Sequence, residues 1–194
     1  MSEAARRLVI GITGASGVIY GVRALQLLRE SNVETHLVMS RSAEMTLAYE
    51  TDFKPKDVRG LASVNHAVAD VGASISSGSF HTMGMLIVPC SIRSMSEIAT
   101  GVTSSLLTRA ADVALKEKRR LVLGLRETPL HGGHLRNLTI LADIGAVVAP
   151  IVPAFYPRPK SVEDIVDQTV GRLLDLFGIE TGVVKRWEGG PGGA

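Results

Sequence analysis

Hydrophobic positions along the chain alternate between two patterns. Short, nearly continuous apolar runs predict buried strands, and longer stretches with apolar residues three or four positions apart predict amphipathic helices. The predicted strands cover residues 7–12, 34–39, 84–89, 120–125 and 145–149. The predicted helices cover residues 17–30, 42–50, 93–101, 103–117, 132–143 and 161–177.

This alternation predicts an α/β fold with an open, mostly parallel sheet and helices on both faces. The strands are apolar throughout, as at Met85–Val88 and Leu121–Leu123, which is expected when both faces of a sheet are covered. We therefore expect a Rossmann-like or flavodoxin-like three-layer sandwich. Residues 1–187 form one domain in this interpretation, and residues 188–194 form a flexible Gly-rich tail.

Polar clusters follow four of the predicted strands. Thr13–Gly17 follows the first strand, Ser40 the second, Cys90–Ser94 the third and Arg126–Glu127 the fourth. In parallel α/β sheets, ligands bind beyond the carboxyl ends of the strands. The four clusters therefore predict a single shared site at that edge of the sheet.

The loop Thr13–Gly17 (Thr-Gly-Ala-Ser-Gly) joins the first strand to the first helix. Its glycines allow a ligand to approach the backbone, and the following helix N-terminus attracts anions. The loop lacks the Lys of phosphate-loop ATPases, and its glycine spacing differs from that of the dinucleotide fingerprint. Two interpretations stay open: the loop holds the phosphate of a nucleotide-like cofactor, or it is only a tight turn.

Composition excludes several classes of protein. The 194 residues are 45% hydrophobic but only 4% aromatic, so the core must be aliphatic. A net charge of +2, from 21 basic and 19 acidic residues, does not favour nucleic-acid binding. One cysteine excludes an intrachain disulfide and a multi-cysteine metal site. No apolar stretch has the length of a membrane span, and no signal peptide is recognised, so we expect a cytoplasmic protein.

Charged residues near the predicted site allow two interpretations each. Arg126–Glu127 could transfer a proton beside an anion or form a surface ion pair. Arg109 and Lys116 lie seven residues apart on one helix face, with Asp112 between them. The two cations could bind an anion, or the three residues could form a solvated, ion-paired face. Arg172 borders an apolar stripe, where it could reach a phosphate or extend to solvent.

Two further features are expected to have structural roles. His131 and His134 have a spacing that a metal site could use, but no third ligand follows at a standard spacing, so we expect no metal. Cys90 lies at a strand end without the pattern of a hydrolase nucleophile, so we expect a buried thiol.

The segment 150–160 contains four prolines and cannot be helical. We expect it to form a stiff connection, since each proline ring fixes one backbone angle. Such a connection could hold two aromatic side chains, those of Phe155 and Tyr156, over a pocket.

Seven motifs in this order resemble the flavin prenyltransferase family, the partners of reversible aromatic-acid decarboxylases. The resemblance extends from about residue 7 to Trp187. The motifs are Thr13-Gly-Ala-Ser-Gly17, Tyr49-Glu-Thr-Asp52, Pro89-Cys-Ser91, Arg109-Ala-Ala-Asp-Val-Ala-Leu-Lys-Glu117, Arg126-Glu127-x-Pro129, Phe155-Tyr156-x-x-Pro159 and Arg186-Trp187.

The resemblance implies a specific reaction. Members of the family join a dimethylallyl group from dimethylallyl monophosphate to N5 and C6 of reduced FMN, without a metal. The product, prenylated FMN, serves a separate decarboxylase. Family members form large homo-oligomers, often dodecamers, with the pocket at subunit contacts. Two alternatives stay open: an FMN-dependent oxidative decarboxylase of cysteine peptides on the same fold, and a non-catalytic flavin carrier.

The resemblance also implies roles for individual residues. The residues expected to contact FMN are Gly14, Ala15, Ser16, Ser40, Ser91, Ile92, Arg93, Ser94 and Arg126. The residues expected to hold the phosphate of the donor are Tyr156, Arg172, Lys116 and Arg109. The residues expected to act in catalysis are Glu127, Glu50, Tyr156 and Ser16, with the two glutamates handling protons.

Overall fold

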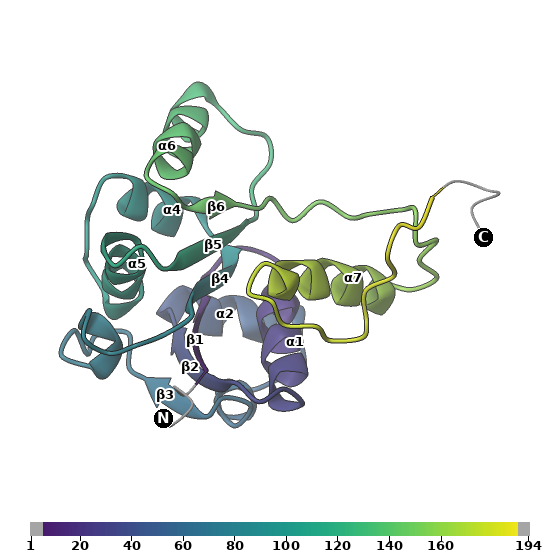
Figure 1. Cartoon of the computed structure of the whole chain (residues 1–194), viewed down its shortest axis with the longest axis horizontal. Coiled ribbons are helices and arrows are strands. Elements are labelled where there is room, and N and C mark those ends of the chain that lie inside the picture. Colours follow the sequence, from purple (N-terminus) through teal and green to yellow (C-terminus); the bar gives the residue numbers. More distant parts are fainter. Residues whose placement is uncertain (1–5, 190–194) are drawn as a thin grey trace.

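Six strands form one open sheet in the computed structural model, which describes residues 6–189 (Figure 1). They are β1 (Arg7–Ile12), β2 (Glu34–Met39), β3 (Val64–His66), β4 (Gly84–Cys90), β5 (Arg120–Leu125) and β6 (Val147–Val148). The order is β3-β2-β1-β4-β5-β6, and every pair of neighbours is parallel. This is the strand order of the Rossmann type, so the predicted α/β sheet is confirmed.

Helices cover both faces of the sheet (Figure 1). They are α1 (Val18–Arg29), α2 (Arg41–Glu50), α3 (Pro55–Arg59), α4 (Ile92–Ala99), α5 (Leu106–Lys116), α6 (Gly132–Asp143) and α7 (Val162–Asp175), with a short 3₁₀ turn at Ser74–Ser76. One apolar cluster joins the sheet to α1, α2, α3 and α7, and a second joins it to α4, α5 and α6. Because side chains alternate along a strand, Leu86 enters the first cluster and Ile87 the second.

The sequence patterns missed the structure between residues 51 and 83. Here the chain forms α3 and β3, neither of which was predicted. The helix has five residues and the edge strand three, too few for a hydrophobic period to become visible. The other elements begin and end within a few residues of their predicted bounds; for example, the predicted strand 145–149 is reduced to β6. Residues 190–194 of the predicted tail lie outside the described residues.

The direction of winding changes between β1 and β4. From β1 the chain winds outwards to β2 and β3, and from β4 it winds the opposite way to β5 and β6. Such a switch point opens a crevice at the carboxyl ends of the two strands. The buried hydroxyl of Thr13 joins these ends, since it donates to the carbonyl of Pro89 at 2.7 Å and accepts from the N–H of Ser91 at 2.8 Å.

A chain of titratable groups lies across β2 and β3. The Nε2–H of the buried His36 donates to Glu34 at 2.8 Å, and its Nδ1 lies 3.0 Å from Nε2 of His66, at hydrogen-bond distance. Burial lowers the pKa of His66, and His36 adds to this shift, while Asp70 opposes it. Burial alone would raise the pKa of Glu34, but hydrogen bonds and charges from His36 and Arg7 hold it below its usual value.

These shifts predict that the fold loses stability in mild acid. A histidine whose pKa is lowered in the folded state contributes its full stabilisation of the fold at pH values above its ordinary pKa of about 6.5. This stabilisation is lost as the pH falls from there through the pKa of the folded state. The lowered pKa of Glu34 likewise stabilises the fold, and this stabilisation is lost as the pH falls below about 4.5. We expect the Tm to fall between about pH 8 and about pH 5, and we expect His66→Gln to reduce that fall. A control variant, His81→Gln, changes an exposed histidine. A fall in Tm as large in His66→Gln as in the wild type would contradict this account.

Candidate functional site

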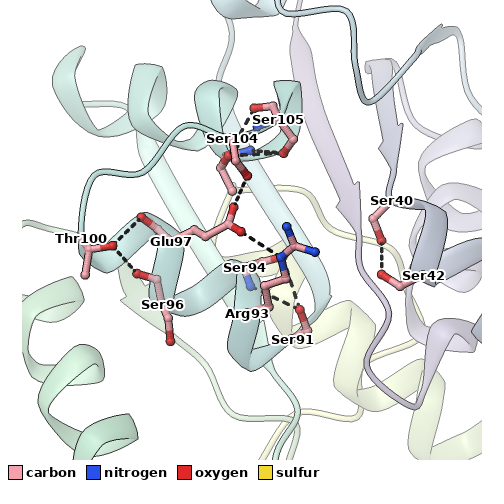
Figure 2. A network of polar contacts seen from close by, with 11 residues as sticks. Ser40, Ser42, Ser91, Arg93, Ser94, Ser96, Glu97, Thr100, Ser104 and Ser105 are labelled. Carbon is pink, nitrogen blue, oxygen red and sulfur yellow. Dashed lines mark hydrogen bonds and ion pairs between the residues drawn. The ribbon is translucent and has the colours of Figure 1, made fainter.

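A cleft of about 590 Å³ lies at the carboxyl edge of the sheet, beside the switch point. It is lined by segments that follow β1, β2, β3 and β4, by the connection between α4 and α5, and by the first turn of α5. The lining residues are Gly14, Ser40, Arg41, Ser42, Val68, Ser91, Arg93, Ser94, Glu97, Ser104, Ser105, Leu107 and Thr108. Figure 2 shows polar side chains of this cleft from both sides of the switch point, together with Ser96 and Thr100, which lie outside its lining. Three of the four predicted polar clusters contribute residues to this cleft, whereas Arg126 and Glu127 are not among its lining residues.

Three helices begin at the cleft, each with a serine at its N-cap. Ser40 begins α2, Ser91 begins α4 and Ser105 begins α5, and each hydroxyl accepts from the backbone N–H three residues later, at 3.0, 3.3 and 3.4 Å. A helix N-terminus carries partial positive charge and leaves further N–H groups without intrahelical partners. The convergence of three such ends, together with Arg41 and Arg93, makes the cleft suited to an anion.

Gly14 permits close packing on one side of the cleft. A Cβ atom at this position would lie 2.4 Å from the Cβ of Ser42 and 3.0 Å from its backbone carbonyl carbon. The hydroxyl of Thr46 in α2 also donates to the carbonyl of Gly14 at 3.3 Å. The loop after β1 therefore lies directly against α2, and this contact requires a glycine.

The start of α1 is bound by a carboxylate from another helix. Glu50, the last residue of α2, accepts from the N–H groups of Gly17 at 2.7 Å and Val18 at 3.2 Å. The helix end expected to hold a ligand phosphate thus holds a carboxylate of this chain, because a carboxylate satisfies the same unpaired N–H groups. The contact also brings Glu50 to the loop that contains Ser16. The helix N-termini that line the cleft are those of α2, α4 and α5.

Arg126 and Glu127 lie where the sequence placed them, directly after β5. The N–H of Arg126 donates to the carbonyl of Cys90 at 3.1 Å, which holds this segment beside the end of β4. The Arg126 side chain is exposed, and the Glu127 carboxylate accepts from the N–H of Thr128 at 3.0 Å. Both residues are therefore available at the carboxyl edge.

The residues expected to hold the donor phosphate do not meet in one chain. Lys116 ends α5, about 16 Å along the helix from its N-cap, and forms an ion pair with Glu117. Arg109 pairs with Asp112 at 2.7 Å, as the spacing of the two residues suggested. On another element, α7, an ion pair of 2.7 Å joins Arg172 to Asp175.

Tyr156 also lies away from the cleft. The segment 150–160 is not helical, as predicted, but it runs beside α7 and away from the sheet (Figure 1). The Tyr156 hydroxyl donates to the carbonyl of Lys185 at 3.2 Å and accepts from Gln168 at 2.9 Å. Within one chain Tyr156 is bound to α7 and the C-terminal segment, and its place over a ligand pocket stays a prediction.

Cys90 and the two histidines have structural roles. Burial raises the pKa of the Cys90 thiol to about 12, so the thiol is not ionised at neutral pH, and the predicted buried thiol is confirmed. His131 caps α6 by accepting from the N–H of Gly133 at 3.0 Å, and its ring stacks on that of His134 with centroids 3.6 Å apart. Within residues 6–189, no group of three or more metal-ligand side chains is present.

Sequence reasoning missed part of the cleft lining. Glu97, Ser104 and Ser105 line the cleft but were not singled out as site residues. A signal for Ser105 existed, since a serine three positions before Thr108 at a helix start is a capping pattern. In the part of the chain that the structure describes, no helix combines the length and the apolar character of a membrane span.

The packing of Gly14 predicts a loss of stability on substitution. Gly14→Ala forces the loop away from α2, and we expect the free energy of unfolding to fall by ~1–3 kcal/mol, as for other overpacked sites. The matched control is Gly72→Ala, because a Cβ there meets only one atom within 4 Å, Oδ1 of Asp70 at 3.5 Å. Urea unfolding measures both variants. Equal stability of Gly14→Ala and the wild type would show that the loop and α2 are not in close contact.

Comparison with known proteins gives close relatives. The chain matches the flavoprotein family model over residues 1–174. It is 58% identical over 187 residues to flavin prenyltransferase UbiX of Escherichia coli K12, covering 95% of this chain and 99% of that protein. It is 53% identical over 184 residues to the mitochondrial flavin prenyltransferase PAD1 of Saccharomyces cerevisiae, covering 95% of this chain and 76% of that protein.

Solved structures show the same similarity. AnUbiX (PadA1), crystallised in complex with FMN and dimethylallyl pyrophosphate, has a TM-score of 0.95 and 52% identity over 96% of this chain and 99% of its own. A dodecameric FMN-dependent UbiX-like decarboxylase of Escherichia coli O157:H7 has a TM-score of 0.93 and 49% identity over 94% of this chain and 100% of its own. The FMN-dependent cysteine decarboxylase TvaF, at 16% identity and a TM-score of 0.61, shares the fold alone.

Proposed function

The chain belongs to the UbiX family of flavin prenyltransferases, and from this premise we propose the reaction that it catalyses. It joins the dimethylallyl group of dimethylallyl monophosphate to N5 and C6 of reduced FMN, and phosphate leaves. The cleft at the switch point is the observation that supports this proposal, because three serine-capped helix N-termini meet there. The prenylated FMN is passed to a separate decarboxylase.

The cleft residues fit a flavin nucleotide. A volume of about 590 Å³ lies within the range of ligand pockets, roughly 300–1,000 Å³. Gly14 lines the cleft, and the helix N-termini at Ser40 and Ser91 offer hydrogen bonds to a phosphate. Arg93 and Arg126 add positive charge. When bound, reduced FMN supplies the nucleophilic atoms N5 and C6.

The donor end of the site requires cations and a proton carrier. Positive charge develops on the allylic carbon and negative charge on the leaving phosphate, so fixed cations around the phosphate lower the barrier. Arg109, Lys116 and Arg172 supply these cations in the proposal, and Tyr156 donates a hydrogen bond. Glu127 takes the proton released at C6 or delivers one to the departing phosphate.

Separation of these residues supports an assembly in which partner chains complete each cleft. Lys116 is about one helix length from the cleft of its own chain, and Tyr156 lies on a segment that runs away from it. Phe155 of this segment and Trp187 near the C-terminus are 68% and 65% exposed. They form apolar surface that an oligomer would bury. We propose a homo-oligomer, a dodecamer, in which the donor residues reach a neighbour's cleft. The cytoplasmic location stays a prediction.

Mass spectrometry tests the reaction directly. Under anaerobic conditions, the chain with reduced FMN and dimethylallyl monophosphate should yield a flavin heavier by one C₅H₈ unit, and the diphosphate is tested beside it. We expect Glu127→Gln to lose at least about 100-fold in turnover while FMN stays bound, since a positioned acid or base contributes roughly that factor. Glu180→Gln, at an exposed position, is the control. Unchanged FMN with both donors would refute the proposal.

Co-expression of two inactive variants tests the shared cleft. Lys116→Ala removes a donor cation and Arg93→Ala removes a cleft cation, so each variant alone should lose activity. In random mixed oligomers, up to about a quarter of the clefts join an intact Arg93 to a partner's intact Lys116, and activity should return to about that level. No recovery in mixed oligomers would show that both residues act within one chain.

A further inference from the structure

A carboxylate lines the cleft that is proposed to bind anions. Glu97 lies in α4, and its side chain is only 18% exposed. Its Oε1 accepts from Nε of Arg93 at 2.9 Å, and its Oε2 accepts from the hydroxyl of Ser104 at 2.6 Å (Figure 2). Its backbone carbonyl accepts from the N–H of Val102 at 2.8 Å. Glu97 thus joins α4 to the connection that leads to α5.

Glu97 remains ionised at neutral pH. Burial raises the pKa of its carboxyl, but the hydrogen bonds from Ser104 and Arg93 outweigh burial and hold the pKa below its usual value. A charged acid in an anion-binding cleft opposes the ligand unless the charge is neutralised. Here Arg93 neutralises it, so the pair must be considered as one unit.

The pair contributes little to the stability of α4. Arg93 lies in the first turn of the helix and Glu97 lies four residues later, towards its end. This order opposes the helix dipole, which favours acids near the N-terminus and bases near the C-terminus. The side chain of Arg93 is also 82% exposed, so solvent screens the ion pair strongly. The arrangement therefore needs an explanation other than helix stability.

We propose that Glu97 is a positioning residue that holds the guanidinium of Arg93 in the cleft for the flavin nucleotide. This inference rests on the proposed function. A guanidinium has five N–H donors, and the contact with Glu97 uses the one on Nε, so the terminal nitrogens keep theirs for a ligand. Arginine otherwise loses rotamer freedom when it binds. Glu97 removes part of this cost before the ligand arrives, and Ser104 fixes Glu97 in turn.

Two effects of removing the charge of Glu97 oppose each other. An unpaired Arg93 would attract anions more strongly, but its exposure to solvent weakens that gain. Loss of the fixed orientation acts in the opposite direction and affects a long, flexible side chain. We expect the second effect to be larger, so Glu97→Gln should weaken FMN binding although it makes the cleft more positive.

A double-mutant cycle on FMN binding to the full chain tests this role. FMN affinity, measured by quenching of flavin fluorescence, should fall about 3- to 10-fold in Glu97→Gln. In an Arg93→Ala background the same change should have less than about a twofold effect, because the residue through which Glu97 acts is gone. An equal loss in both backgrounds, or no loss in the first, would overturn the proposal. A wild-type chain that binds no FMN would overturn both this proposal and the proposed function.

Arg93→Lys provides a second variant that leaves Glu97 in place. Lysine keeps the positive charge but has no Nε–H in a planar fork, so Glu97 cannot orient it in the same way. We expect a similar weakening of FMN binding with a Tm close to that of the wild type. Unchanged FMN affinity in Arg93→Lys would show that charge alone matters and would overturn the proposal even if Glu97→Gln did not fold.

Discussion

The hydroxyl of Thr13 connects the two strands between which the sheet reverses its winding. It is 1% exposed, and it both donates to Pro89 and accepts from Ser91. A buried hydroxyl without partners would cost free energy, whereas this one is satisfied in both directions. Because Ser91 is also the N-cap of α4, one side chain fixes the ends of β1 and β4 and the start of a helix at the cleft. The geometry of the cleft depends on this contact.

The acids around the cleft differ in what they bind. Glu50 is bound to the first N–H groups of α1, and Glu97 is bound to Arg93 and Ser104. Their negative charges are thereby engaged by groups of the protein. Glu127, after β5, accepts from the N–H of the next residue. Glu127 therefore accepts one hydrogen bond, whereas Glu50 and Glu97 each accept two at their carboxylates, which supports Glu127 as the acid that moves a proton in the proposed reaction.

The strands and most helices could be predicted because burial on two faces leaves long apolar runs and regular helical spacing. The polar residues that follow β1, β2, β4 and β5 could be placed at one edge of the sheet because the apolar runs show where each strand ends. The edge strand β3 and the short helix α3 left no periodic signal. The capture of the α1 N-terminus by Glu50 could not be predicted, because the contact joins residues 33 positions apart. The separation of Lys116 and Tyr156 from the cleft likewise depends on the tertiary arrangement.

A crystal structure of the chain with bound FMN would locate the flavin. We expect it at the carboxyl ends of β1 and β4, in contact with Gly14, Ser91 and Arg93. A second groove lies at the opposite edge of the sheet, lined by residues that include Lys118, Arg119 and Ile144. FMN bound in that groove, with the cleft beside Thr13 empty, would contradict the account.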